Sequence, residues 1–443
     1  MVFLLSSHPE PGTGAVTESA PGSASPSLSS SAAPTTDSDL PPRAKSTVAI
    51  VALSGVVMAL SGPGQTAGLS VFVDHIIGDL NVSRSVVSGA YLIGTLGGAV
   101  ALPWIGRAVD RFGIRRMLAS IALAFGAFLT LLSVVQEVIG LTVAFVGVRA
   151  LGQGGMTLVA TTAVAIAVTR KRGTALGVTS AVGAAGISLF PMLAELAILQ
   201  LGWRSVLVWE AALVWLVVLP IAWWGMRGVT RSQAEEERAT TDSPSSTAAE
   251  PSWALRAIVR TSMFWLITGA VAVAGLTGTA LFFHQIAVLG EQGLSPAQAA
   301  ANFLPQTVAG LVAALAFSSA ADRFSPKLLI FIAMMMHVGA MAMLPFVSPG
   351  VSALVYGMAL GAAGAGARSV EAAAMPFYYG TEVIGSLRGL TQSVAVSSTA
   401  IAPLLLSLGH DLVGSYAPVV MALAILPVGV ALAAPFARVP TEE

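Results

Sequence analysis

The sequence predicts an all-α integral membrane protein with twelve transmembrane helices, arranged as two parallel six-helix repeats. Of the 443 residues, 55% are hydrophobic and only 10% are charged, whereas a soluble domain carries about 25% charged residues. The apolar residues come in runs of about 20 or more, which is the length that crosses a bilayer as a helix. A sequence pattern also recurs after 212 residues, which indicates a duplicated half.

The apolar runs place the expected helices in chain order. They cover residues 47–76, 85–105, 116–136, 138–168, 174–200, 203–226, 261–286, 296–318, 327–346, 350–378, 386–409 and 415–437. Residues 1–44 are rich in Ser, Pro, Ala and Thr, a composition that predicts a disordered tail. Residues 228–255 have no apolar period, so we expect a linker between a half at 45–227 and a half at 256–438.

The basic residues predict the orientation in the membrane. If the N-terminus is cytoplasmic, 18 of the 22 Lys and Arg residues fall on the cytoplasmic side, and only Arg84 and Arg204 fall outside. Arg149 and Arg368 remain within apolar runs. Cytoplasmic loops carry such an excess of positive charge. We therefore expect a multi-pass protein of the cell membrane with both termini in the cytoplasm.

The repeat relates the two halves at a constant offset. The matched pairs include Thr95 and Thr307, Gly98 and Gly310, Asp110 and Asp322, Arg111 and Arg323, and Gly177 and Gly389. Six spans return the chain to its starting side, so the two halves have the same orientation. Parallel halves of this kind are a transporter architecture.

Several function classes have no support in the sequence. There is no cysteine, the five histidines are scattered, and the formal net charge is zero, so no metal site and no nucleic-acid-binding surface is expected. The phosphate-binding pattern G-x-x-x-x-G-K-[ST] is missing, which argues against ATP-driven transport. We expect no enzyme activity and no cofactor, with a proton or other ion gradient as the energy source.

Polar residues on the first helix are candidates for contact with a substrate. Ser61 and Gln65 share one helical face, and Gly62-Pro63-Gly64 interrupts the helix between them. Interrupted helices at mid-membrane often mark substrate sites. The alternative is a kink that serves helix packing.

Charged residues within spans are the second group of candidates. Arg149 lies one turn before Gln153, and Arg368 lies three residues before Glu371, where the two side chains can pair. An intramembrane arginine costs at least about 2.5 kcal/mol and should face protein or water. We expect both arginines to face one central cavity. The alternatives are structural ion pairs and, for Arg149, a side chain that extends to the membrane interface.

Further polar residues complete the candidate set. His284 ends the seventh helix, and the favoured alternative to a functional role is a histidine at the outer interface. Five more polar residues could either line a cavity or form part of a gate: Tyr91, Thr95, Asn302, Gln306 and Gln392. The substrate or coupling candidates are Ser61, Gln65, Arg149, Gln153, His284, Arg368, Glu371 and Gln392.

The loop after the second helix resembles a known signature. Its pattern is Gly106-x-x-x-Asp110-Arg111-x-Gly113-x-Arg115-Arg116, and Asp322-Arg323 belongs to a degraded second copy. This loop, and the stretch "RALGQGG" from Arg149, are similar to motifs of the major facilitator superfamily. The resemblance implies rocking halves around a central cavity. It also implies that Asp110 braces the halves near Gly385–Arg388. By residue type alone, the loop charges could simply fix topology.

Two segments indicate a branch of that superfamily. Residues Lys171–Arg204 and "GSLRGLTQSVAVSSTAIAP" are similar to the monocarboxylate-porter and oxalate/formate-antiporter branch, although its first-helix motif and eighth-helix arginine are missing. We expect a monomeric secondary transporter of a small organic anion, coupled to protons. The alternative is a drug or metabolite exporter with a mostly apolar cavity. A sensor would usually add a folded soluble domain, and the repeat disfavours a channel.

Overall fold

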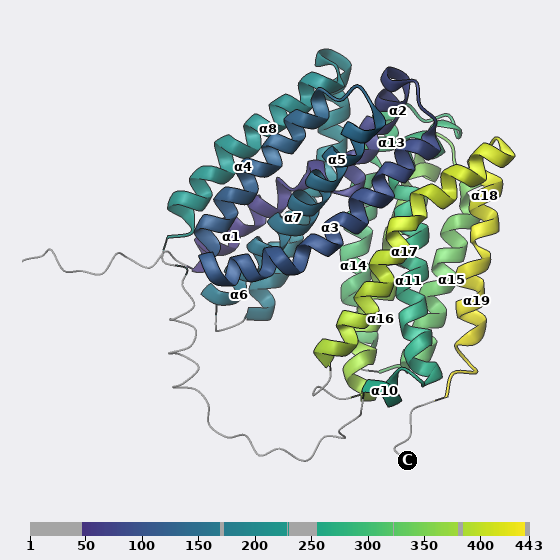
Figure 1. Cartoon of the computed structure of the whole chain (residues 1–443). Coiled ribbons are helices and arrows are strands. Elements are labelled where there is room, and N and C mark those ends of the chain that lie inside the picture. The colour runs from purple at the N-terminus through teal and green to yellow at the C-terminus, as the bar shows by residue number, and fades with distance from the viewer. Residues whose placement is uncertain are drawn as a thin grey trace, which may run out of the picture. The chain divides into compact units, whose positions relative to one another are not determined.

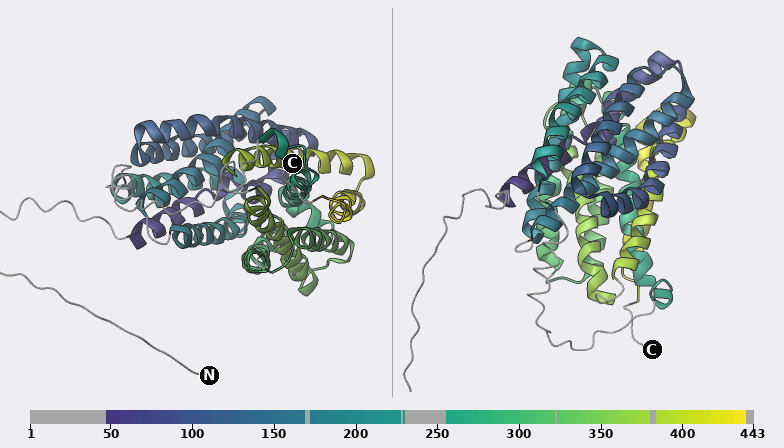
Figure 2. Two further views of the ribbon diagram at one scale, coloured as in Figure 1. Left: turned by 90° about the horizontal axis from the view of Figure 1, so that it is seen from below. Right: turned by 60° about the vertical axis from the view of Figure 1, so that its left-hand side comes forward.

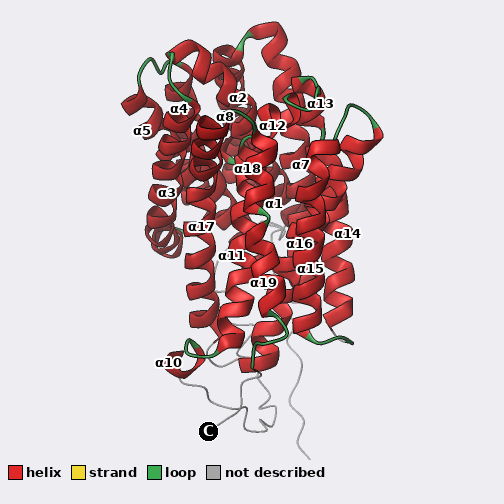
Figure 3. Cartoon of the chain, turned by 90° about the vertical axis from the view of Figure 1, so that its right-hand side faces the viewer, coloured by secondary structure: helices red, strands yellow, loops and turns green. Residues whose placement is uncertain are grey.

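The structure is a computed structural model that describes residues 47–168, 172–227, 229, 255–321, 323–379 and 384–438. Every element in these ranges is helical, and Figure 3 shows helices joined by short loops. The predicted tail at 1–44 and nearly all of the predicted linker at 228–255 lie outside the described residues, as does Asp322.

The first group of helices, called here the N-terminal helices, covers residues 47–225. Its elements are α1 (Thr47–Ala59), η1 (Gly62–Gly64), α2 (Thr66–Leu80), α3 (Arg84–Phe112), α4 (Ile114–Ser133), α5 (Val138–Val148), η2 (Arg149–Met156), α6 (Thr157–Ala167), α7 (Arg172–Leu201), α8 (Trp203–Pro220) and η3 (Ile221–Gly225). The segments η2 and η3 are π-helical, and η1 is a short 3₁₀ turn.

The second group, called the C-terminal helices, begins at residue 255. Its elements are α10 (Leu255–Ile258), α11 (Ser262–Phe283), α12 (Gln285–Gly290), α13 (Pro296–Ala301), α14 (Phe303–Ala321), α15 (Pro326–Met343), η4 (Leu344–Phe346), α16 (Val351–Tyr379), α17 (Ile384–Val413), α18 (Tyr416–Leu423) and α19 (Ile425–Ala433).

The prediction of an all-α membrane protein is confirmed. Within the described residues, ten helical segments are long and apolar enough to cross a membrane. The other two predicted spans are the run from α1 through η1 to α2, which Gly62–Gly64 interrupts, and α16, which carries Arg368 and Glu371. Helix boundaries lie within a few residues of those expected for most spans, because long apolar runs bounded by charged or Gly-containing turns define them well.

The two groups of helices stand side by side in Figures 1 and 2. Among the N-terminal helices, α1 packs on α7, α3 on α5, and α4 on α8; among the C-terminal helices, α14 packs on α16 and α11 on α17. The main contacts between the groups join α3 to α17, α7 to α13 and α14, and α2 to α11 and α12. Successive spans run in opposite directions, so the turn at Gly113 lies at one end of the bundle and the turn at Asn81 at the other.

The apolar core is shared by the two groups at the Asn81 end. In the part of the chain that the structure describes, one buried cluster runs through the N-terminal helices and continues into the C-terminal helices through residues near this end, such as Phe283, Ala299 and Tyr356. A second cluster, with Phe264, Ile330 and Met375, belongs to the C-terminal helices at the Gly113 end. Among the described residues, the buried apolar cluster that joins the two groups therefore lies toward the Asn81 end.

Two glycines of α16 allow close contact with the α14 backbone and with Asn302, the residue before α14. A Cβ atom at Gly361 would overlap the carbonyl oxygen of Gln306, and one at Gly357 would overlap the side-chain oxygen of Asn302. The spacing Gly357-x-x-x-Gly361 places both glycines on one face of α16, the arrangement that allows close approach of transmembrane helices. This contact fixes the position of Asn302 and Gln306.

Candidate functional site

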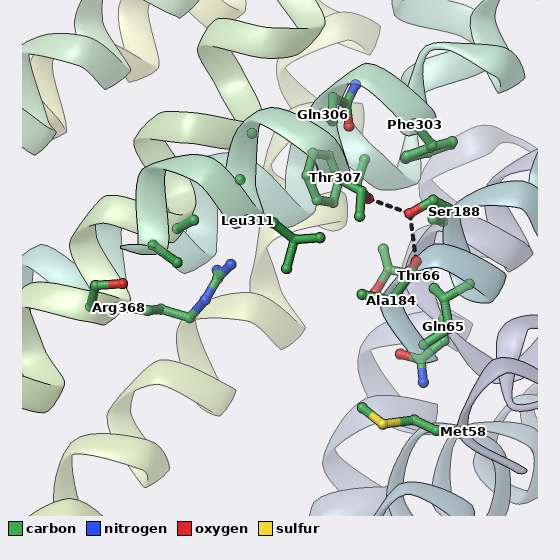
Figure 4. A pocket seen from close by; sticks show the side chains of 18 of the residues that line it. Met58, Gln65, Thr66, Ala184, Ser188, Phe303, Gln306, Thr307, Leu311 and Arg368 are labelled. Atoms are coloured by element: carbon green, nitrogen blue, oxygen red, sulfur yellow. Dashed lines mark hydrogen bonds between the residues drawn. The ribbon is translucent and has the colours of Figure 1, made fainter. Parts of the chain in front are cut away.

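A cavity of about 810 Å³ lies between the N-terminal and the C-terminal helices (Figure 4). The helices that line it are α1, α2, α7, α11, α14 and α16, together with η2 and the turn at Gln65. Its polar lining includes Gln65, Gln153, Ser188, Gln306, Thr307 and Arg368. Its large apolar side chains are those of Met58, Ile187, Phe282, Phe303 and Leu311.

The exposure of the lining residues shows which way the cavity opens. Toward the Asn81 end, Ser188, Phe303 and Gln306 are buried. Toward the Gly113 end, Ser318 and Arg368 are exposed. The cavity is therefore closed at the Asn81 end and accessible from the Gly113 end.

The first-helix break is held by its own side chains. Ser61 is buried, and its hydroxyl donates a hydrogen bond of 2.7 Å to the carbonyl oxygen of Met58, which also accepts from the Ser61 backbone N–H at 3.2 Å. Gln65 Nε2 in turn donates to Ser61 Oγ at 2.9 Å. Gln65 lines the cavity, whereas Ser61 supports it from behind the break.

Arg149 fastens the fourth span to the first and second spans. Its Nε donates to Thr95 Oγ1 at 3.2 Å, and one terminal nitrogen donates to the Gly64 carbonyl oxygen at 3.2 Å and to Thr66 Oγ1 at 3.3 Å. The guanidinium carbon lies 4.6 Å from the centre of the Tyr91 ring. Arg149 is 4% exposed and does not line the cavity, although Gln153, one turn on, does.

Arg368 is the charged group among the described residues that line the cavity. Its side chain is exposed to the cavity space (Figure 4), and no hydrogen bond or ion pair with another described residue holds its guanidinium. In particular, no ion pair joins Arg368 to Glu371, although their spacing on α16 allows one. We expected both intramembrane arginines to face the cavity. Arg368 does so, whereas Arg149 is buried among the N-terminal helices.

Two other candidate residues lie away from the cavity. His284 is buried, and its Nε2 lies 2.9 Å from the carbonyl oxygen of Pro403, so it ties the end of α11 to α17. Gln392 is exposed on α17. The structure does not bring either residue to the cavity.

A comparison of sequences now identifies the family. The profile of the Major Facilitator Superfamily matches residues 50–403. The chain belongs to the major facilitator superfamily. It is therefore a multi-pass membrane transporter and not an enzyme. No match was found among curated protein sequences.

Similar solved structures agree on the fold. Two of them are of a bacterial homolog to the human lysosomal transporter Spinster, in an inward-facing and occupied conformation and in an inward-facing and unoccupied conformation. The first has a TM-score of 0.67 at 16% identity, covering 87% of this chain and 96% of that chain. The second has a TM-score of 0.65 at 16% identity, covering 88% and 97%. At this identity the likeness concerns the fold.

The signature loop of this transporter lies at the exposed junction of α3 and α4. Gly113 has a φ of +80° and joins the two helices, a conformation that requires glycine or strains any other residue. Asp110, Arg111, Arg116 and Arg323 are exposed, and Gly106 is half-buried. The Arg115 guanidinium carbon lies 4.1 Å from the centre of a Trp223 ring. The side chains at 384–386 and 388 are outside the described residues, so the predicted bracing of Asp110 stays a prediction.

Polar and aromatic contacts close the transporter toward the Asn81 end. Ser188 on α7 is hydrogen-bonded to Thr307 on α14, directly at the cavity wall (Figure 4). Ser85 donates to Asp411 near the tips of α3 and α17. The ring centres of Tyr91 and Phe283 lie 4.4 Å apart. Each of these contacts joins an N-terminal helix to a C-terminal helix.

Sequence reasoning did not single out several of the lining residues. Ser188 and Thr307 were missed as a contact, and so were the aromatic pair Phe282 and Phe303, whose ring centres lie 5.7 Å apart. Small hydroxyl residues and phenylalanines are common in apolar runs and have no distinctive spacing. No signal in the sequence marks them.

Proposed function

We propose that this transporter moves a small organic anion, most simply a monocarboxylate, by alternating access. The observation that carries the proposal is Arg368. An arginine in a membrane span is costly unless it faces water or a counter-charge, and this one faces the cavity. A carboxylate can accept two parallel hydrogen bonds from a guanidinium, so an anionic substrate would complete the site.

The rest of the lining supports a small amphipathic anion. Phe282, Phe303 and Leu311 offer apolar contact, and Gln65, Gln153 and Gln306 offer polar contact. With one positive charge and no acidic residue among the described lining residues, the cavity favours a single negative charge. The branch resemblance in the fifth and eleventh helices points to the same substrate class.

We further propose that transport is coupled to protons. Glu371 lies about one turn from Arg368 on α16 and is half-buried. Protonation of a carboxylate at this place would change the potential at Arg368 and therefore its affinity for an anion. The distribution of Lys and Arg supports a cytoplasmic Gly113 end in the cell membrane.

The proposal is tested by uptake into proteoliposomes that contain the purified protein. A panel of labelled short carboxylates, neutral isosteres and organic cations is offered with and without an imposed pH gradient. We expect saturable uptake of carboxylates alone, accelerated when protons and substrate share the outer side. Uptake of neutral or cationic compounds without any carboxylate would contradict the proposal.

Export of a largely apolar compound is the second candidate. It is favoured by one observation, the cluster of Met58, Ile187, Phe282, Phe303 and Leu311 on the cavity wall. Transport of apolar compounds that is insensitive to replacement of Arg368 would select this function over the first.

A further inference from the structure

We propose that the substrate bound by Arg368 also carries a hydrogen-bond donor, and that the side-chain oxygen of Gln306 accepts it. The inference rests on the proposed function and narrows its substrate class. A carboxylate with a hydroxyl or N–H group fits the cavity, whereas an unsubstituted carboxylate or an apolar compound leaves an acceptor without a partner.

The amide of Gln306 has one permitted orientation. Gln285 Nε2 donates to the Ala299 carbonyl oxygen at 2.8 Å, and because a carbonyl can only accept, Gln285 must turn its oxygen toward Gln306. Gln306 Nε2 donates to that oxygen at 2.8 Å. The Ala299 carbonyl therefore sets the orientation of the Gln285 amide, and the Gln285 amide sets that of Gln306.

A second chain of contacts enforces the same orientation. Asn302 Nδ2 donates to the Ala353 carbonyl oxygen at 2.7 Å, which leaves the Asn302 oxygen to accept from Gln306 Nε2 at 3.1 Å. Both hydrogens of the Gln306 amide are thus used. Turning the amide over would set its oxygen against two other oxygens, so the fixed group available to the cavity is an acceptor.

That acceptor has no partner among the described residues. Gln306 is 3% exposed, and its Oε1 is buried without a hydrogen bond. Gln306 lines the cavity, and in Figure 4 its amide nitrogen points away from Thr307 while its oxygen lies on the side of Thr307. A buried acceptor without a donor is unfavourable. A donor delivered by the substrate would remove this cost only when the substrate is bound.

The distance to Arg368 fits a small molecule. The Gln306 amide donates to the Asn302 oxygen, which lies at the Cβ position of Gly357, and one terminal nitrogen of Arg368 lies 3.9 Å from the Cβ position of Gly364. Gly357 and Gly364 are seven residues apart, a rise of about 10.5 Å along the helix. The cationic group and the acceptor are therefore separated by about two helical turns, which suits a carboxylate whose hydroxyl or N–H group lies several bonds from the charge.

The experiment compares matched substrates on the intact protein. Carboxylates with a hydroxyl at carbon 3, 4, 5 or 6 are tested against their O-methyl ethers, which keep the oxygen and lose the donor, and against the unsubstituted acids. We expect wild-type protein to prefer at least one hydroxy acid by roughly 5-fold or more in KM over both analogues, the size expected for satisfying a buried acceptor.

A variant then assigns the preference to Gln306. In Gln306→Met, which is similar in size and has no amide, the KM ratio between hydroxy acid and ether should fall to about one, while Gln136→Leu in an exposed turn keeps the wild-type ratio. Equal transport of hydroxy acids and ethers by wild-type protein overturns the inference, even if Gln306→Met does not fold. A preference that persists in a folded Gln306→Met also overturns it. Failure of every carboxylate would instead refute the proposed function.

Discussion

Arg149 and Arg368 both place a positive charge within a membrane span, but their surroundings differ. Arg149 uses its guanidinium on Thr95, Thr66 and the Gly64 carbonyl, whereas Arg368 has its guanidinium in the cavity. Both were predicted to face either the protein interior or water, because the cost of a charge in the membrane applies to any arginine in a span. Their separate roles depend on partners that only the fold brings close.

Replacing Arg149 by lysine should weaken the protein without removing the charge. Lysine cannot reproduce the fork that reaches Thr95 and Gly64 together, so we expect the free energy of unfolding to fall by about 2 kcal/mol. Thermal unfolding in detergent measures this, with Arg256→Lys on an exposed surface as the control. Equal unfolding temperatures for both variants would show that the Arg149 contacts do not stabilise the break.

At the scale of elements, the sequence predicts the positions of the helices, but it predicts only some of the places where a helix is interrupted. The Gly62-Pro63-Gly64 break follows from residue chemistry, since proline removes a helical hydrogen bond. The π-helical turn at Arg149–Met156 does not, because nothing in "RALGQGGM" specifies it without the neighbouring helices. Of the residues predicted to contact substrate, likewise only some lie at the cavity. Gln65, Gln153 and Arg368 line it, while His284 satisfies a carbonyl of α17 instead.

The close contact of α14 and α16 should not tolerate a side chain at Gly361. Because the added Cβ of Gly361→Ala would overlap the Gln306 carbonyl oxygen, the helices must separate, and we expect a loss of about 1–3 kcal/mol of stability. Gly278→Ala is the matched control, since no atom lies within 4 Å of its Cβ position. We compare the unfolding temperatures of the two variants. If the Gly361→Ala variant is as stable as the Gly278→Ala variant, α14 and α16 do not depend on close packing at Gly361.

At the scale of the molecule, the two groups share apolar packing and polar contacts at the Asn81 end. A transporter that works by alternating access must break these contacts when the cavity opens to the other side. The rocking units are proposed to be the six-helix halves, residues 45–227 and 256–438. The constant offset of the repeat supports this division, because duplicated halves have the same internal packing.

A reversible cross-link tests this motion, and the natural chain contains no cysteine that would interfere. Ser85→Cys and Asp411→Cys replace two side chains that are in contact. We expect oxidation of the double variant to stop transport and reduction to restore it, with each single variant unaffected by oxidant. Full transport by the cross-linked protein would exclude separation of the halves at this end.

The central claim is that Arg368 binds an anionic substrate in the cavity, and the most direct measurement is KM for carboxylate uptake in Arg368 variants. We predict that Arg368→Gln raises KM by about 10-fold or more, as expected for losing hydrogen bonds to a charged group. Arg368→Lys should retain part of the affinity, and Arg256→Gln should match wild-type protein. A folded Arg368→Gln that transports carboxylates with unchanged KM and rate would contradict the account.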